Sequence, residues 1–355
     1  MPIETITRAA KRYYEELYLQ QVERQLFYNL FNIPDESSDA GFLLDTLIGS
    51  PYAVTYKAKG GQSHVRPYTP GSGRLIEPPI AAEKTPLTEE LLDKLVAGVD
   101  AVGGFGRNEA KLVGDIVRQH VSAFNMLKNY QAMQVFVTGI FEAKGKNGGD
   151  LDLDIDYSRA AGNALTADFS SVDITAAFTA AINKLRDNGT PLDNLVAILG
   201  TNWQANYGAD SDVTTAQQNN NANIIAASDM VPPELANIEG LYILGRYRGP
   251  GMIAPLWVCG YAPPVAYVSD LGETAAPYIG VNDAVFFSLT DQRFKVNRGV
   301  NIIDGNGARA REVGDLVVDR FTDNDPVTEY LRSQSRHVFV PGNINHTVKT
   351  TGSNF

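Results

Sequence analysis

Acidic residues occupy every second position in one short segment of the chain: Asp150, Asp152, Asp154 and Asp156. Carboxylates in this pattern can bind Ca²⁺, because this cation takes oxygen ligands from alternate positions of a loop. A calcium loop of the EF-hand type that began at Asp150 would need Gly at its sixth position and Glu at its twelfth. The chain has Ile155 and Ala161 there, so the sequence does not predict a metal site.

A half-buried strand explains the same alternation, because its apolar residues would all face inward: Leu151, Leu153 and Ile155. The preceding segment Val135 to Phe141 has the composition of a strand, and Asn147-Gly148-Gly149 that of a turn. A three-residue turn would set two lysines opposite two of the acids: Lys146 opposite Asp150 and Lys144 opposite Asp152. We therefore expect a β-hairpin whose outer acids pair with cations, on the facing strand or on another chain.

The histidines and the single cysteine offer no metal site. The four histidines stand at positions 64, 120, 337 and 346, and neither an HExxH motif nor paired cysteine ligands occur. We expect His120 to pack beside the apolar stripe of a helix. Cys259 follows an apolar segment and has no second cysteine to pair with, so a buried thiol in a reducing compartment is predicted.

Glycine-rich motifs give no support for catalysis either. Gly71-Ser72-Gly73 lacks the GxSxG spacing of a nucleophile elbow, and Gly104-Phe105-Gly106 is followed by Glu109 where a dinucleotide-binding loop has its third glycine. Pairs of catalytic carboxylates cannot be selected from 41 acidic residues by sequence. The sequence therefore predicts no catalytic residue, no cofactor and no metal, and a protein that is not an enzyme.

The composition is that of a globular chain with weak affinity for nucleic acids. Its 355 residues, 44% of them hydrophobic, suffice for one large or two medium cores. The net charge of −11 argues against tight binding of phosphates, which requires clustered Lys and Arg. Neither a signal-peptide pattern nor a run of about 18 apolar residues occurs, so we expect no secretion signal and no membrane span.

Two helices and one extended segment are predicted in the first half of the chain. Helical spacing of apolar residues predicts an amphipathic helix over Ile6 to Phe31, which lies on a neighbouring chain or, as we favour, packs on its own domain. The same spacing predicts a helix about 40 Å long over Asn108 to Phe136. Between them, Tyr52 to Pro79 has the pattern of two strands with glycine-rich turns and few large aliphatic residues. This segment is expected to project and to be buried outside its own domain.

The second half predicts a mixed sheet with flanking helices. A helix over Asp173 to Leu185, stopped by Asn188-Gly189, precedes a buried strand over Asn194 to Gly200. Further strands are expected in four apolar segments: Leu241 to Leu244, Pro255 to Val258, Val265 to Val268 and Ala284 to Leu289. The chain then ends with two short strands and a polar tail: Asp315 to Phe321, His337 to Pro341 and Asn343 to Phe355. The last part is expected to pair with the hairpin that follows the long helix.

Three groups of motifs follow one another along the chain. The first lies in the extended segment: Lys59-Gly60-Gly61, Tyr68-Thr69-Pro70-Gly71 and Ile76-Glu77-Pro78-Pro79. The second is the long helix that runs through Thr138-Gly139 into the strand at Asp150 to Tyr157. The third and most specific lies near the end: Asp325-Pro326, Glu329-Tyr330, Gln334-Ser335 and Val338 to Pro341. Together they resemble the lambda-like major capsid proteins of the phage capsid protein E family, which have the Hong Kong 97-type fold.

The resemblance implies an α+β fold of five regions. These are an N-terminal arm (1–45), an extended loop (46–90), a peripheral domain with a spine helix and a β-hairpin (91–165), an α/β axial domain (166–305) and a return to the peripheral domain with a C-terminal tail (306–355). The extended loop would contact a neighbouring subunit through a set of polar and small residues: Lys57, Lys59, Gly60, Gly61, Arg66, Tyr68 and Pro70. The closing segment of the peripheral domain would contain Asp325, Pro326, Glu329 and Tyr330.

The implied function is that of the major capsid protein of a tailed bacteriophage. Hexamers and pentamers of the chain would close an icosahedral shell around double-stranded DNA without binding it tightly, together with decoration, scaffolding and portal proteins. The shell would assemble in the host cytoplasm and involve no membrane. Lysines near the loop, such as Lys84, could attack an amide of a neighbouring subunit, but no residue requires such a cross-link. Two alternatives stay open, an encapsulin-type compartment and a soluble α/β enzyme.

Overall fold

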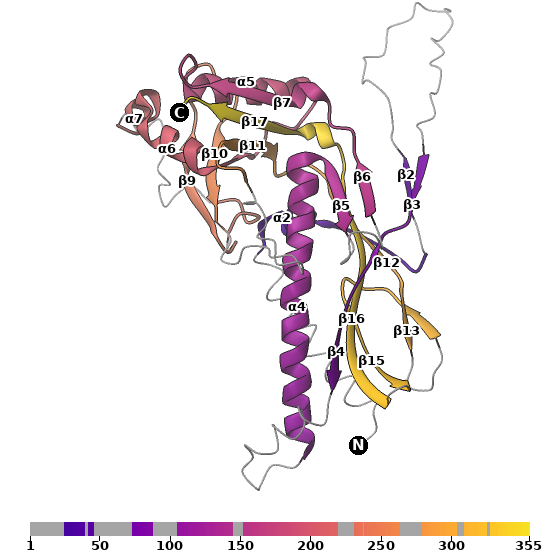
Figure 1. Ribbon diagram of the computed structural model, residues 1–355. Helices are drawn as coiled ribbons and strands as arrows, with labels where there is room; N and C mark the ends of the chain where they lie inside the picture. Colours follow the sequence, from indigo (N-terminus) through magenta and orange to yellow (C-terminus); the bar gives the residue numbers. More distant parts are fainter. Residues whose placement is uncertain are drawn as a thin grey trace, which may run out of the picture.

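The computed structural model describes residues 25–39, 42–45, 73–87, 105–144, 152–218, 231–236, 238–262, 279–303, 309–324 and 327–355. One long helix, α4 (Phe105–Thr138), runs through the middle of the molecule. A six-stranded sheet with its helices lies at the C-terminal end of α4, and a five-stranded sheet lies along its N-terminal half (Figure 1). The α+β class is confirmed.

The helix α4 is longer than its apolar stripe predicts. Its 34 residues give a length of about 50 Å. It ends at Gly139, whose φ of 82° lies in the left-handed region that stops helices. The Arg159 guanidinium donates to the last carbonyl groups of α4, those of Phe136, at 2.7 Å, and Val137. A cation at this position also opposes the negative end of the helix dipole.

The six-stranded sheet contains strands from the second half of the chain, in an order that differs from the chain order. From one edge to the other they are β7 (Ala164–Asp168), β17 (Thr347–Ser353), β11 (Asp283–Ser288), β8 (Leu195–Leu199), β10 (Leu256–Tyr261) and β9 (Leu241–Tyr247). The β7/β17 and β8/β10 pairs are parallel, and the remaining neighbours are antiparallel. The predicted mixed sheet is thereby confirmed, whereas the strand expected at Val265 to Val268 lies outside the described residues.

Both faces of this sheet are covered, and alternate residues of each central strand enter two different cores. In β8, Leu195, Ala197 and Leu199 pack on the side of α5 (Ile174–Asp187), α6 (Thr201–Ala209) and α7 (Ser211–Gln218). Val196 and Ile198 pack on the other side, in one cluster with residues of α2 (Leu26–Leu30) and of the C-terminal half of α4. A strand buried on both faces reads as a continuous apolar run, as β8 does. Its helix neighbour α5 begins at Asp173, which caps Ala176, and ends before Gly189 at a φ of 80°.

The five-stranded sheet is organised around β16 (Val327–Pro341), the longest strand. Its neighbours are β15 (Val317–Asn324), β4 (Ile80–Leu87) and β12 (Arg293–Arg298), and β1 (Ile33–Ser37) pairs with β12. An apolar cluster joins β4 and β16 to the N-terminal half of α4: Leu87, Val113, Ile116, Val117, Val121, Phe124, Leu316 and Leu331. The remaining strands of the described residues form three two-stranded antiparallel sheets: β2 (Phe42–Asp45) with β3 (Gly73–Ile76), β5 (Ile140–Lys144) with β6 (Asp152–Asp156), and β13 (Val300–Ile303) with β14 (Arg309–Glu312).

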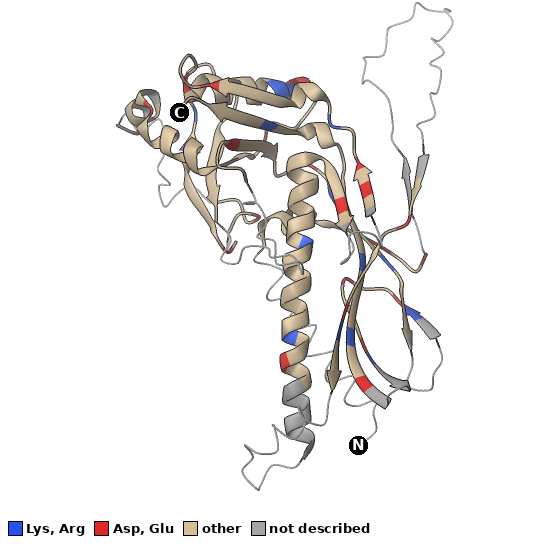
Figure 2. Cartoon of the chain, viewed as in Figure 1, with Lys and Arg blue, Asp and Glu red and all other residues tan. Residues whose placement is uncertain are grey.

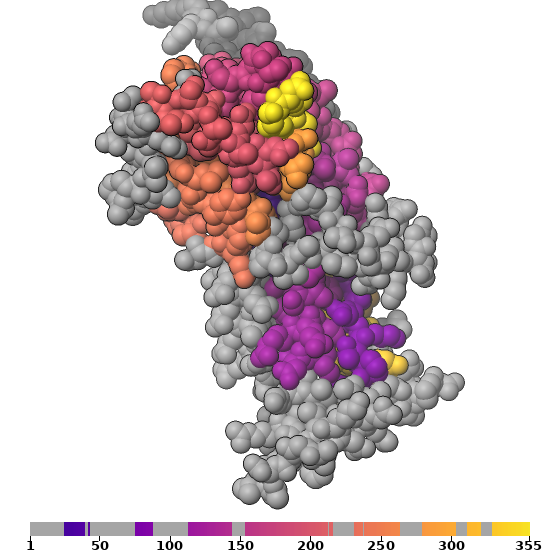
Figure 3. All heavy atoms as spheres, turned by 60° about the vertical axis from the view of Figure 1, so that its left-hand side comes forward, coloured from indigo at the N-terminus to yellow at the C-terminus, as the bar shows by residue number. Residues whose placement is uncertain are grey.

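The polar tail predicted at Asn343 to Phe355 is wrong, because residues 347–353 form β17 inside the six-stranded sheet. Val348 and Thr350 are buried there, so a strand rich in β-branched threonine fits a pleated surface despite its polarity. In Figure 3 the end of this segment, in yellow, lies at the molecular surface beside the residues coloured red.

The pairing expected between the last part of the chain and the hairpin after α4 is also wrong. Among the described residues, β5 and β6 pair with each other, while β16 pairs with β4, β12 and β15. The strand β12 lies within the region expected to be axial but pairs with β16 in the other sheet. Such long-range pairing is decided by burial over the whole fold, and local patterns do not contain it. The five-region division stays a prediction.

The N-terminal segment is part of the core where it is described. Phe27 and Phe31 are fully buried, and their rings lie 5.7 Å from Phe136 and 5.1 Å from Phe339. Packing on its own domain, the arrangement that we favoured from sequence, therefore holds for residues 26–31. The rest of the predicted helix over Ile6 to Phe31 lies outside the described residues.

Candidate assembly surfaces and a buried polar seam

The contact residues predicted in the extended loop lie outside the described residues: Lys57, Lys59, Gly60, Gly61, Arg66, Tyr68 and Pro70. Its two ends are described, because β2 and β3 pair antiparallel with Asp45 opposite Gly73. Ile76 anchors β3 in the core at 3% exposure, while Leu75 is 74% exposed. The strands that flank residues 46–72 are therefore paired with each other, and β3 contains an exposed leucine.

The closing segment is described from Val327 onward, so Asp325 and Pro326 lie outside it. Glu329 accepts hydrogen bonds from Arg320 on β15, with Nη2 to Oε2 at 2.5 Å. The ammonium of Lys84 on β4 lies 4.8 Å from the centroid of the Tyr330 ring. Glu329 and Tyr330 thus connect β16 to two of its neighbouring strands, β15 and β4, within one chain.

The acidic hairpin has the predicted register, with Lys144 opposite Asp152. Ile155 is buried and Leu153 is partly buried, as expected for the inward face, whereas Leu151, Lys146 and Asp150 lie outside the described residues. On the outer face Asp154 stands directly opposite Glu142 (Figure 2). Like charges in facing positions destabilise a strand pair.

A row of polar residues, not predicted from sequence, separates the two apolar clusters along α4. On β16, Ser333, Ser335 and His337 face α4. We call these residues and their partners the polar seam: His120, Lys128, Gln131 and Asp315. The Ser333 hydroxyl lies 2.8 Å from Nδ1 of His120, whose Nε2 lies 2.8 Å from the Thr85 hydroxyl. The expected packing of His120 beside the apolar stripe is confirmed.

The second histidine of the seam is fully enclosed. Nε2 of His337 lies 2.7 Å from Oε1 of Gln131, and Nδ1 lies 2.9 Å from the Ser335 hydroxyl, which donates to the backbone oxygen of Asp315 at 2.7 Å. Burial, followed by the positive charge of Lys128, lowers the pKa of His337 well below its ordinary value. Burial of the ring therefore disfavours the charged imidazolium.

The seam also contains a buried amine beside a carboxyl group. Nζ of Lys128, a side chain with 0% exposure, lies 2.9 Å from Oδ1 of Asp315. Burial lowers the pKa of Lys128 well below its ordinary value and raises the pKa of Asp315 to about 7, because each charged form loses its hydration. Tyr28 donates to Oδ2 of Asp315, and Nζ of Lys295 lies 3.0 Å from the Tyr28 hydroxyl.

Sequence reasoning missed this pair for a clear reason. Lys128 occurs within the apolar stripe of α4, where a lysine ordinarily extends to solvent, and Asp315 lies 187 positions away. The sequence did contain one indication of a buried polar contact on β16. Ser333, Ser335 and His337 occupy alternate positions and so share one face of the strand, and the residues on either side of them on that face, Leu331 and Phe339, are apolar.

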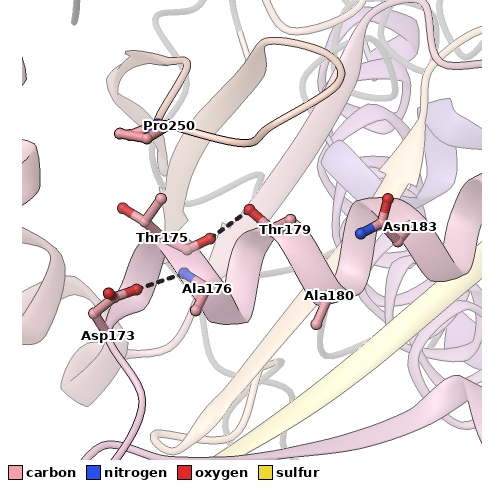
Figure 4. A pocket seen from close by; sticks show the side chains of 7 residues that line it. All are labelled: Asp173, Thr175, Ala176, Thr179, Ala180, Asn183 and Pro250. Carbon is pink, nitrogen blue, oxygen red and sulfur yellow. Dashed lines mark hydrogen bonds between the residues drawn. The ribbon is translucent and has the colours of Figure 1, made fainter.

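A shallow depression of about 460 Å³ lies on the outer face of α5 (Figure 4). It is lined by Asp173, Thr175, Ala176, Thr179, Ala180, Asn183 and Pro250. Its one carboxylate, Asp173, accepts a hydrogen bond from the Ala176 amide at 2.6 Å and thereby caps its own helix. The depression brings no pair of acid and base groups together.

The described residues offer neither a cluster of metal ligands nor a membrane-spanning helix. They contain no group of three or more His, Cys, Asp and Glu side chains placed to hold a metal ion. Within the same residues no helix, α4 included, is both long and apolar enough to cross a membrane. Cys259 is buried, which raises the pKa of its thiol to about 12, and the predicted buried thiol is confirmed.

The arrangement of a long helix between two sheets is shared with solved structures. The crystallised candidate capsid protein of a prophage of E. coli CFT073 is 15% identical, with 95% of this chain and 97% of that chain covered and a TM-score of 0.66. The chain has the Hong Kong 97-type fold. No family model and no curated protein matches the sequence, so membership in the capsid protein E family stays a prediction.

Two other structures with this fold are similar at lower scores. The mature capsid of bacteriophage PhiM1 is 12% identical, with 91% of this chain and 85% of that chain covered and a TM-score of 0.46. The holo-SrpI encapsulin complex from Synechococcus elongatus PCC 7942 is 7% identical, with coverages of 90% and 84% and a TM-score of 0.41. At these scores they add nothing to the assignment of the Hong Kong 97-type fold.

Proposed function

We propose that this chain is the major capsid protein of a tailed bacteriophage, whose hexamers and pentamers close an icosahedral shell around double-stranded DNA. The observation that carries the proposal is the likeness to the E. coli prophage protein over 95% of this chain and 97% of that chain. Because both chains are covered almost end to end, the likeness concerns the whole architecture and not one shared motif. A virion location and a structural, non-catalytic role follow from this function.

The charge of the chain supports a container that holds DNA loosely. A net charge of −11 disfavours binding to phosphates, and packaged DNA carries its own counterions. Contacts with scaffolding, decoration and portal proteins are part of the proposal and have no assigned residues.

The first test is electron microscopy of particles assembled from the full-length chain. Closed shells built of hexamers and pentamers are the expected result, with nucleic acid in particles isolated from infected cells. An enzyme cargo in place of nucleic acid would assign the chain to an encapsulin-type compartment. A stable monomer that turns over a substrate would overturn the shell function.

The second test concerns the extended loop, through which we propose that each subunit contacts its neighbour. Deleting residues 57–69 keeps the β2/β3 pair, whose last rungs are Asp45 opposite Gly73. We expect a folded subunit with an unchanged melting temperature that no longer assembles.

A companion variant of full length replaces Lys57, Lys59 and Arg66 with Gln. It separates the contribution of charge from that of the loop itself, and partial assembly is expected. If the deletion instead unfolds the monomer, the loop belongs to the core of its own subunit and the proposed contact is wrong.

A further inference from the structure

Lys128 of α4 and Asp315 are held in close contact in the interior of the protein. Nζ of Lys128 lies 2.9 Å from Oδ1 of Asp315 and also donates to the backbone oxygen of that residue at 2.5 Å. The lysine side chain is completely buried and the aspartate side chain is 17% exposed. The hydrogen bond to the backbone oxygen therefore holds the amine beside the carboxyl group of the same residue, with little bulk water to compete.

The carboxyl group is polarised from its far side. Tyr28 donates to Oδ2 of Asp315. The ammonium of Lys295 lies 3.0 Å from the Tyr28 hydroxyl and 4.1 Å from the centroid of its ring, so positive charge stands behind this hydrogen bond. Burial raises the pKa of Tyr28 above its ordinary value, which keeps the hydroxyl a donor. A donor fixed at one carboxyl oxygen makes the carbon more electrophilic and stabilises charge that develops there.

Protonation favours the reactive forms of both partners. An amine attacks a carbonyl carbon only when it is neutral, and a carboxyl group loses its oxygen more easily as the acid than as the anion. Burial shifts Lys128 towards the neutral amine and Asp315, with a pKa of about 7, towards the neutral acid. Both shifts have the same cause, the loss of hydration by each charged form.

We propose that Lys128 and Asp315 condense to an isopeptide bond within the chain. The lone pair of Nζ forms a bond to Cγ of Asp315, and one carbon–oxygen bond of the carboxyl group breaks. The oxygen departs as water with the carboxyl proton and one proton from the amine. Neither an oxidant nor a second reactant is needed, and the inference does not depend on the proposed function.

The bond would join the middle of α4 to the segment that leads into β15. It would close a loop across 187 positions of sequence, and a covalent link of this kind stabilises a fold mainly by restricting the unfolded chain. Lys349 and Asp283 provide a comparison at the same distance of 2.9 Å. Their side chains are 30% and 16% exposed, and Asp283 accepts from Thr351 instead of a buried tyrosine. We expect no bond there.

Mass spectrometry of the intact, denatured full-length protein tests the proposal. The wild type is expected to be lighter than its sequence by one water molecule, and Lys128→Arg to have its full sequence mass. Asp315→Asn is expected to lose ammonia instead of water, so that it reaches the same final mass as the wild type. The matched control Lys349→Arg should retain the loss of water.

Peptide mapping gives a second measurement that does not require the variants to fold. Trypsin cannot cleave after an acylated lysine, so a branched peptide containing Lys128 and Asp315 is expected from the wild type. Wild-type protein at its full sequence mass after prolonged incubation in the folded state at neutral pH would overturn the proposal. A loss of water that persists in Lys128→Arg would overturn it as well.

Discussion

The C-terminal end of α4 differs from its middle in the contacts that stabilise it. Towards its C-terminus, Phe136 packs edge-on against Phe287 of the six-stranded sheet at 4.6 Å, and the buried guanidinium of Arg293 lies over both rings, 5.1 and 5.5 Å from their centroids. In the middle, Lys128 donates to the backbone oxygen of Asp315 and Gln131 meets His337, while Ser335 donates to the same Asp315 oxygen. Apolar packing is non-directional, whereas every donor of the polar seam must find its acceptor.

This difference shows which contacts set the register of the fold. If β16 shifted by one residue, Arg332, Gln334 and Arg336 would face α4 in place of the two serines and His337. Guanidinium groups do not fit where serines allow a helix to approach, and their charges would be unpaired there. We infer that the apolar clusters supply most of the stability and the polar seam fixes the alignment of α4 on β16.

The largest effect is expected from removal of β17. Deleting residues 347–355 leaves β7 and β11 without their shared neighbour and opens the six-stranded sheet. We expect loss of cooperative unfolding, measured by circular dichroism melting and limited proteolysis. A control that deletes Asn354 and Phe355 retains the strand and should melt cooperatively. An unchanged melting curve for the longer deletion would show that β17 is dispensable.

Substitutions on the two sides of α4 compare the apolar core with the polar seam directly. Phe287→Ala is expected to lower the free energy of unfolding by about 3–5 kcal/mol, because it leaves a cavity in a close-packed core. Ser335→Ala is expected to lower it by about 1–3 kcal/mol, because His337 and the Asp315 carbonyl lose a partner. Denaturant unfolding of dissociated subunits measures both. A larger loss for Ser335→Ala would reverse the comparison.

Acid is expected to remove the contribution of His337 to stability. Burial lowers the pKa of His337 below its ordinary value of 6.5, so on acidification the unfolded state takes up the proton first. Its contribution to stability is complete above about pH 6.5 and declines as the pH falls below that value. His337→Gln is expected to flatten part of this decline in melting temperatures measured against pH. Parallel profiles for wild type and variant would contradict this account.

The smallest effect is expected on the exposed hairpin. Asp154→Asn removes a negative charge directly opposite Glu142 and is expected to raise the free energy of unfolding by about 0.2–0.5 kcal/mol. Asp156→Asn is the matched control, because Asp156 stands opposite Ile140 and accepts from the Ser158 amide at 2.7 Å. No gain is expected from it. Equal effects in a denaturant series would show that the facing acids do not repel.

The sequence determined the features that arise from neighbouring residues. Spacing of apolar residues placed α4 and β8, Asp173 and Gly189 bounded α5, and turn length set Lys144 opposite Asp152. Periodicity, capping and turn chemistry act over a few residues and can therefore be read along the chain. The contact residues proposed in the extended loop stay a prediction, since their burial depends on another molecule.

The tertiary structure alone decided which distant segments meet. It placed β17 between β7 and β11 although its composition resembles a tail, and it paired β4 with β16. It also brought Lys128 to Asp315, 187 positions apart, with the lysine completely buried and the aspartate 17% exposed. Such contacts depend on how the whole chain excludes water, so a lysine in an apolar stripe becomes a buried partner only once a strand covers it.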